Sequence, residues 1–189
     1  MVKAQEKQTD SVAWEFSAAA NFNIFPDDFI FLPIFQANKG RLHLEARYNY
    51  EDLATSSARM GYNFTGGKKI EYTITPMVGG VFGNSNGIAP GLELILTKNK
   101  FELTSEAEVL FELNKENSFF YIWTDLMYSI NDWLLIGLSA QRTRLYKTNL
   151  DLQRGFLMGA SWKKFKITTY VYNPGFDSSF FLVSLSSRF

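Results

Sequence analysis

The sequence contains no cysteine, and its 189 residues carry no net charge, because 19 lysines and arginines balance 19 aspartates and glutamates. The absence of cysteine excludes a disulfide framework, a thiolate metal site and a thiol nucleophile. The balanced charge argues against a nucleic-acid-binding protein, which usually has a basic excess. Long apolar runs are also absent, whereas a membrane-spanning helix needs about 20 nearly continuous apolar residues.

Aromatic residues, in contrast, are abundant: 18 Phe, 9 Tyr and 4 Trp make up 16% of the chain. Polar and apolar residues also alternate along the chain, with a period of two. In residues 41–51 every odd position is polar and every even position is apolar. Side chains alternate between the two faces of a strand, so this pattern predicts a strand with one polar and one apolar face. The pattern recurs in residues 69–78, 100–113 and 164–171, and less cleanly in 11–24, 56–65, 91–98 and 178–189.

The connections between these segments predict the number of strands. Five are tight and polar, at residues 38–40, 66–68, 98–100, 129–132 and 163–164, and they alternate with six longer ones. Eleven connections imply twelve strands of the length that spans a membrane, about 9 to 11 residues. We therefore predict an all-β protein, an antiparallel transmembrane up-and-down β-barrel of twelve strands, with ten or fourteen as alternatives. A soluble barrel or sandwich is less consistent, because twelve such apolar faces would overfill a small closed barrel.

The end of the chain carries a resemblance to a known class. The segment 180–189 ends in Phe189, whose face it shares with Leu185, Val183 and Phe181, although Ser187 departs from the usual apolar residue. Trp133 and Trp162 flank tight turns, as in an interfacial girdle. The chain resembles Gram-negative outer-membrane β-barrels, and the block 23–52 resembles part of an uncharacterised family of them to which no activity can be attached.

That resemblance implies a location and partners. It implies a multi-pass barrel in the cell outer membrane, with the tight turns and both termini on the periplasmic side. It also implies contact with outer-membrane lipid and lipopolysaccharide, and recognition of Phe189 in the last strand by the barrel-assembly machinery. The polar segment 1–10 has no apolar core, so we expect a mature form with a short periplasmic tail at 1–10 and one barrel domain at 11–189.

The polar faces predict the lining of the lumen. By parity the expected basic residues are Arg41, Arg47, Arg59, Lys69, Lys164, Lys166 and Arg188. The expected acidic residues are Glu15, Glu45, Glu51, Glu71, Glu93, Glu102, Glu106, Glu108, Glu112, Asp125 and Asp151. Acids outnumber bases, so the lumen is expected to be mildly acidic. Tyr121 and Trp123 are expected to add an aromatic patch.

The lumen charges have two interpretations. The basic residues concentrate on the third and fourth strands and three acids on the seventh, which twelve strands would place far apart around the ring. A field between two such walls could orient a charged or dipolar solute. Alternatively, the long Arg and Glu side chains pair across the barrel and fill it, since buried charges must be paired.

Enzymatic chemistry finds little support in the sequence. His43 is the only histidine, and parity places it on the lumen face between Arg41 and Glu45. A hydrogen-bonded structural role is expected for it rather than general-base catalysis. One His, no Cys and no carboxylate cluster with the spacing of a calcium loop predict no metal site. We expect no catalytic residues and no cofactor.

Two segments leave alternatives open. Parity points Arg142, Arg144 and Arg154 outward near a longer loop, where guanidinium groups could bind lipopolysaccharide phosphates, unless a bulge turns them elsewhere. Residues 29–37 are apolar on both faces, so either the lumen side packs on a dry patch or the outer side meets another protein.

The function expected from these features is a narrow passive channel for small polar or charged solutes. The alternative is an accessory barrel with a closed, salt-bridged lumen that acts as a subunit of a larger envelope complex. An outer-membrane enzyme acting on lipid is a third, less supported possibility.

Overall fold

The computed structural model describes residues 13–113, 119–142 and 152–189. Among these residues, no helix is both long enough and apolar enough to cross a membrane. The regular elements are strands, with these bounds: β1 Glu15–Ile24, β2 Phe29–Lys39, β3 Leu42–Tyr48, β4 Thr55–Tyr62, β5 Phe64–Gly66, β6 Glu71–Gly83, β7 Gly87–Lys98, β8 Phe101–Glu112, β9 Phe119–Ser129, β10 Leu134–Arg142, β11 Leu152–Trp162, β12 Phe165–Tyr172 and β13 Phe180–Arg188. The predicted tail, residues 1–10, and the predicted residues Arg144 and Asp151 lie outside the described residues.

The strands form one closed antiparallel barrel. Each strand except β4 and β5 pairs with its sequence neighbours, β1 pairs with β13, and both β4 and β5 pair with β6, which completes the ring. β4 and β5 are two parts of one strand, because both pair with β6 in a single register that places Tyr62 opposite Pro76. Proline has no N–H to donate, so the ladder is interrupted there. The barrel therefore has twelve strand positions, which confirms the predicted number.

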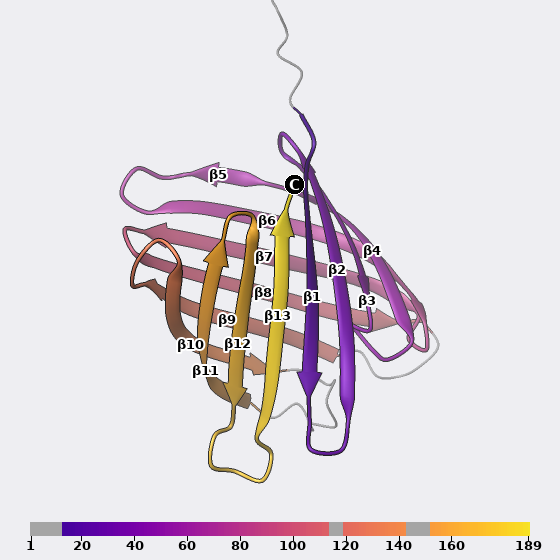
Figure 1. The fold of residues 1–189 in the computed structure, drawn as a ribbon. Coiled ribbons are helices and arrows are strands. Elements are labelled where there is room, and N and C mark those ends of the chain that lie inside the picture. The colour runs from indigo at the N-terminus through magenta and orange to yellow at the C-terminus, as the bar shows by residue number, and fades with distance from the viewer. Residues whose placement is uncertain (1–12, 114–118, 143–151) are drawn as a thin grey trace, which may run out of the picture.

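The connections differ at the two ends of the barrel. We call the end with residues 40–41, 67–70, 99–100, 130–133 and 163–164 the tight-turn end, and the end with 25–28, 49–54, 84–86 and 173–179 the long-loop end. The C-terminus lies at the tight-turn end, beside the β2–β3 turn (Figure 1). There the backbones of Phe16 and Phe189 exchange two hydrogen bonds, at 3.0 and 2.9 Å. That the tight-turn end faces the periplasm stays a prediction.

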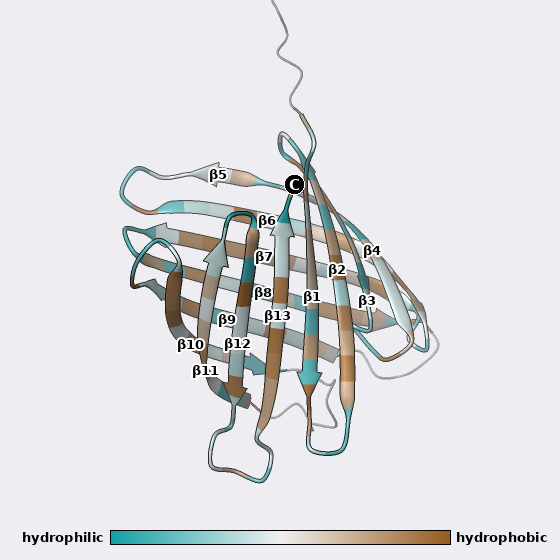
Figure 2. Ribbon diagram, in the orientation of Figure 1, coloured by the Kyte–Doolittle hydropathy of each residue, from teal (hydrophilic) through white to brown (hydrophobic). Residues whose placement is uncertain are grey.

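The barrel has its polar residues inside and its apolar residues outside. On β4, the side chain of Arg59 is turned inward and its residue is only 4% exposed, whereas the adjacent Met60 is 60% exposed. The hydrophilic and hydrophobic residues alternate along the strands in Figure 2. A soluble barrel would show the reverse, because apolar side chains gain free energy by leaving water. The apolar exterior therefore faces lipid.

Aromatic residues concentrate at both edges of this exterior. The exposed rings near the tight-turn end include Trp133, Trp162, Phe165, Phe101 and Phe189, and those near the long-loop end include Phe29, Phe31, Phe82, Phe111 and Phe120. Two aromatic girdles around an apolar band are typical of transmembrane barrels, because aromatic side chains favour the interface between the membrane and water.

Strand β2 is apolar on both of its faces, and the two faces have different surroundings. Phe29, Phe31 and Phe35 point outward and are exposed, whereas Ile30 and Leu32 are buried in an apolar cluster inside the barrel. The lumen side of this strand thus lies on a dry patch, the first of the two alternatives. Its outer side has the aromatic character of the rest of the exterior.

Gly83, at the end of β6, has a backbone conformation that only glycine adopts readily. Its φ is +136°, and a Cβ there would collide with the carbonyl oxygen of Ala54. Gly83→Ala is expected to cost ~1–3 kcal/mol for the conformation, with the collision in addition. Gly175 is the matched control, since its φ is +85° but a Cβ would meet nothing within 4 Å. Urea unfolding of both variants in detergent tests this, and an equal loss would contradict it.

Candidate functional site in the lumen

A network of charged side chains crosses the lumen. Arg47, on β3, is buried, and its guanidinium faces four carboxylates. Its Nε lies 2.5 Å from Glu45 Oε1, and its terminal nitrogens lie 2.5 Å from Glu106 Oε1, 3.6 Å from Glu93 Oε1 and 3.8 Å from Glu108 Oε2. Glu45 is on the same strand as Arg47, but Glu93 is on β7 and both Glu106 and Glu108 are on β8. Arg47 therefore connects strands on different sides of the lumen.

Arg59, on β4, extends the same network. It forms an ion pair with Glu108, and its nitrogens lie 3.7 Å from Glu106 Oε1 and 3.5 Å from Glu51 Oε1. Two arginines therefore share five carboxylates: Glu45, Glu51, Glu93, Glu106 and Glu108. With all seven groups ionised, five negative and two positive charges leave a net charge of −3 at this place.

The expectation of two separated charged walls is wrong. Arg47 and Arg59 reach Glu106 and Glu108 directly, so the basic and acidic strands meet across the lumen. The reason is that the polar side chains are long relative to the local width of the barrel, and burial favours their pairing. The pairing of these side chains across the barrel, which was the other interpretation of the sequence, describes the geometry, although a cavity remains beside them.

A second polar group surrounds Asp125 on β9. Its carboxylate accepts hydrogen bonds from Trp123 Nε1 at 2.8 Å, Ser139 Oγ at 2.5 Å and the Tyr170 hydroxyl at 3.0 Å. Tyr172 lies 2.6 Å from Ser139 Oγ and extends this set. These partners are neutral, so they distribute the charge of Asp125 without cancelling it.

Two apolar clusters narrow the lumen toward the long-loop end. The first cluster comprises Ile30, Leu32, Tyr50, Val81, Ala89, Leu110 and Tyr121. The second cluster comprises Met127, Leu157, Tyr170, Tyr172, Phe180 and Leu182. Phe25 and Trp123 pack against both. The aromatic pair predicted from the sequence, Tyr121 and Trp123, thus belongs to a larger aromatic lining.

Between these groups lies a cavity of about 330 Å³. Its charged lining residues are Glu93, Glu106 and Asp125, and its aromatic lining residues are Tyr50, Trp123 and Tyr170. The described residues around it include no lysine and no arginine. A solute in this cavity would meet carboxylates, hydroxyls and ring faces.

Several residues predicted for the lumen lie elsewhere. Arg41 is in the β2–β3 turn and is exposed, and its Nη1 donates to the hydroxyl of Tyr62, a residue of the outer face, at 3.2 Å. Lys69 and Lys164 are exposed in turns, and Glu71 is exposed at the first position of β6. Strand parity does not extend into turns, which explains the three corrections at Arg41, Lys69 and Lys164, whereas Glu71 lies at the rim on the same face of β6 as the buried Thr75 and keeps its predicted face. Glu102 and Lys166 are half-buried near the tight-turn end, on the lumen side of the barrel wall.

Tyr50 is a lumen residue that parity missed. Even positions of residues 41–51 are apolar and point outward, but β3 ends at Tyr48, and Asn49 has φ +58°. This turn directs Tyr50 inward, where its hydroxyl lies 2.9 Å from Glu106 Oε2 and 2.7 Å from the Tyr121 hydroxyl. The turn signal available in the sequence was Asn49, which lies two residues before the charged pair Glu51 and Asp52.

The remaining predicted residues are placed without a test of their roles. Arg142 and Arg154 are exposed on the outer side near the long-loop end, where contact with lipopolysaccharide stays a prediction. Phe189 packs against Phe16 with ring centroids 6.4 Å apart, and its recognition during assembly also stays a prediction. His43 is buried, with its Nδ1 2.9 Å from Asn38 Oδ1.

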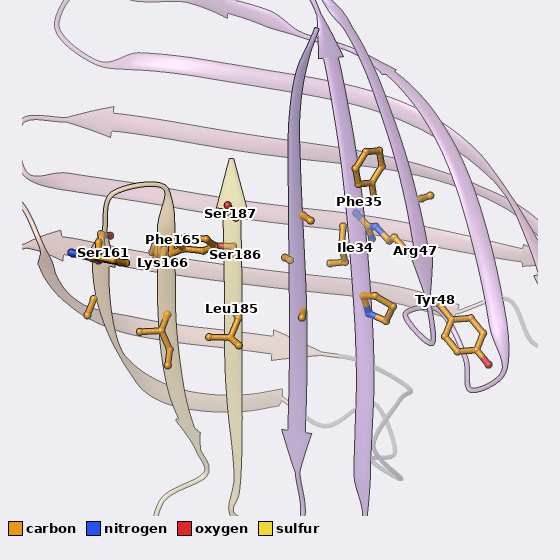
Figure 3. Close-up of a pocket in the computed structure, with 18 of the residues that line it drawn as sticks. Ile34, Phe35, Arg47, Tyr48, Ser161, Phe165, Lys166, Leu185, Ser186 and Ser187 are labelled. Carbon is orange, nitrogen blue, oxygen red and sulfur yellow. The ribbon is translucent and has the colours of Figure 1, made fainter. Parts of the chain in front are cut away.

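The outer wall has a groove of about 1020 Å³ in its tight-turn half. Figure 3 shows Leu185 and Ser187 of β13 on one side of it and Phe35 and Tyr48 on the other. Ala18 and Ala20 on β1 form part of its floor, because their small side chains leave the wall recessed. The lining is almost wholly apolar, as a surface in contact with acyl chains requires.

Comparison with known proteins identifies the fold. No protein-family model matches the sequence, and no curated protein does. Among solved structures, a KdgM porin in complex with disordered oligogalacturonate is similar, with a TM-score of 0.65 and 12% identity over 93% of this chain and 99% of that chain. A second KdgM porin structure has a TM-score of 0.60 and 12% identity, over 93% and 98%. The Acinetobacter baumannii outer membrane protein Omp33 has a TM-score of 0.52 and 10% identity, over 95% and 98%.

At these identities the similarity establishes the fold. The chain has the twelve-strand barrel of outer-membrane porins, which confirms the predicted outer-membrane β-barrel class. Together with its apolar exterior, this is the architecture of a multi-pass barrel of the outer membrane.

Proposed function

We propose that this protein is a narrow outer-membrane channel that favours small cations over anions. The observation that carries the proposal is the lumen cavity, which is lined by Glu93, Glu106 and Asp125 and, among the described residues, by no basic side chain. A pore lined by carboxylates concentrates cations and repels anions. The porin fold supports a channel, and the carboxylates of the lumen support a preference of that channel for cations.

The solute differs in our proposal from the oligogalacturonate bound to the similar KdgM porin. Each galacturonate unit carries a carboxylate, and such a polyanion would meet a network in which five carboxylates share two arginines. The ion pairs and apolar clusters also narrow the lumen. Small cations and small polar solutes fit these features better than an acidic oligosaccharide.

Reversal potentials of the purified barrel in planar bilayers, across a KCl gradient, test the proposal. The expected result for the unmodified protein is discrete openings with cation selectivity. Asp125→Asn is expected to reduce that selectivity, because it removes a carboxylate from the cavity. Glu71→Gln is the matched control, since Glu71 is exposed at the end of a strand, and it is expected to change little. Anion selectivity would contradict the proposal.

A second function has support from one observation. Arg47 and Arg59 pair with acids across the lumen, and a barrel closed in this way could serve as a subunit of a larger envelope complex. Silence in bilayers at all voltages, together with a stable complex after gentle extraction from membranes, would favour this accessory barrel over the channel.

A further inference from the structure

Three potential metal ligands from two distant strands meet inside the barrel. They are His43 and Glu45 on β3 and Glu93 on β7. One ligand atom from each lies within 4.8 Å of the other two. Parity along one strand explains why His43 and Glu45 share the lumen face, but only the closed barrel brings Glu93 to them.

The histidine of this group is prepared to act as a ligand. Asn38 Oδ1 lies 2.9 Å from His43 Nδ1, and it also accepts from Asn63 Nδ2 at 3.0 Å. A carboxamide oxygen only accepts hydrogen bonds, so Nδ1 carries the proton and Nε2 presents a lone pair. Metal-binding histidines are typically oriented in this way by a second hydrogen bond.

His43 Nε2 has no hydrogen-bond partner, although the residue is only 4% exposed. A buried polar atom without a partner is costly and calls for an explanation such as an ion. The carboxylates supply a second, independent argument, because five of them share only two arginines. A divalent cation would satisfy the nitrogen and add positive charge where carboxylates outnumber arginines.

We infer that His43, Glu45 and Glu93 form a binding site for a divalent cation of the zinc type. One imidazole and two carboxylates suit borderline cations such as Zn²⁺, whereas Ca²⁺ and Mg²⁺ prefer oxygen ligands alone. Three protein ligands leave a fourth position for water or a solute. The site does not depend on conduction, so it would exist in an open channel and in a closed barrel alike.

Glu93 is the side chain that can complete the site. Ligand atoms on a tetrahedral zinc ion are about 3.4 Å apart, so the group must contract from its present spacing. The Glu93 side chain is 21% exposed and lines the lumen cavity, and its ion pair with Arg47 is long, at 3.6 Å. Arg47 would keep Glu45, Glu106 and Glu108 if Glu93 moved. The cavity also provides the route by which the cation enters.

Glu45 is held where a ligand is needed. Its Oε1 is paired with Arg47, and its Oε2 accepts from Gln36 Nε2 at 2.8 Å. A carboxylate oxygen has two lone-pair directions, so one hydrogen bond leaves room for one metal bond. Gln36 in turn accepts from Ser17 Oγ at 3.1 Å, which fixes this wall of the site.

Isothermal titration calorimetry with ZnCl₂ tests the site. The barrel is purified in detergent without a polyhistidine tag, which would itself bind zinc, and is stripped with a chelator. The expected result is saturable binding of one Zn²⁺ per barrel, and much weaker binding of CaCl₂. His43→Gln is expected to lower the zinc affinity at least ~100-fold, and Asn38→Ala by ~10–100-fold through the lost orientation of the imidazole.

Glu102→Gln is the matched control, because it neutralises another half-buried acid of the lumen wall that is not among the three ligands. It is expected to bind zinc as the unmodified protein does. A change in electrophoretic mobility on heating in SDS shows that each variant is folded before titration. No saturable zinc binding to the unmodified barrel, or equal affinity in the His43→Gln variant, would overturn the inference. Loss of conduction with zinc binding intact would instead contradict only the proposed channel.

Discussion

Replacing Arg47 with methionine is expected to lower the free energy of unfolding of the barrel by ~3–5 kcal/mol, as the removal of one partner from a buried ion pair generally does. The cost arises from the carboxylates that remain. Arg47 has four of them within 4 Å, and its own side chain is only 1% exposed. Methionine keeps much of the volume, so the loss reports the charge rather than a cavity. Urea unfolding in detergent, followed by tryptophan fluorescence, measures it.

Two further variants make this result specific. Arg41→Met removes an arginine six positions earlier that is exposed in a turn, and it is expected to change stability by less than ~0.5 kcal/mol. Adding Glu106→Gln to Arg47→Met is expected to recover part of the loss, because one unpaired carboxylate is then neutral. Equal losses for Arg41→Met and Arg47→Met would show that the cross-lumen network contributes nothing.

Replacing Trp123 with alanine is expected to increase the single-channel conductance severalfold. The indole lines the lumen cavity and packs against both apolar clusters, so it lies between the two groups that narrow the barrel. It also donates from Nε1 to Asp125 and, at 3.1 Å, to Ser139 Oγ. Its removal widens the path and leaves Asp125 with one donor fewer. Stability is expected to fall by ~3–5 kcal/mol as well.

Trp162 provides the control for this variant. It is 68% exposed on the outer girdle, so Trp162→Ala is expected to leave the conductance unchanged. Trp123→Phe separates the two roles of the indole, because it retains a ring but loses the donor. A folded Trp123→Ala barrel with unaltered conductance would place the constriction elsewhere in the lumen.

The inner surface illustrates how far parity can be trusted. Parity placed Arg47, Arg59, Glu45 and Glu108 on one face of their strands, and all four are buried inside the barrel. It failed for Arg41, which lies in a turn, and for Tyr50, which follows the turn at Asn49. Alternation holds only while the backbone stays extended, so beyond the positive φ of Asn49 both Tyr50 and Glu51 are buried inside the barrel.

The sequence by itself determined that this protein is a twelve-strand barrel with an apolar exterior. That information is local, since a period of two and the punctuation of turns are properties of neighbouring residues. The tertiary structure alone decided that Arg47 meets Glu106 and that His43 and Glu45 meet Glu93. These contacts join strands far apart in the chain, and their distances depend on the tilt, stagger and cross-section of the closed barrel, which no single strand encodes.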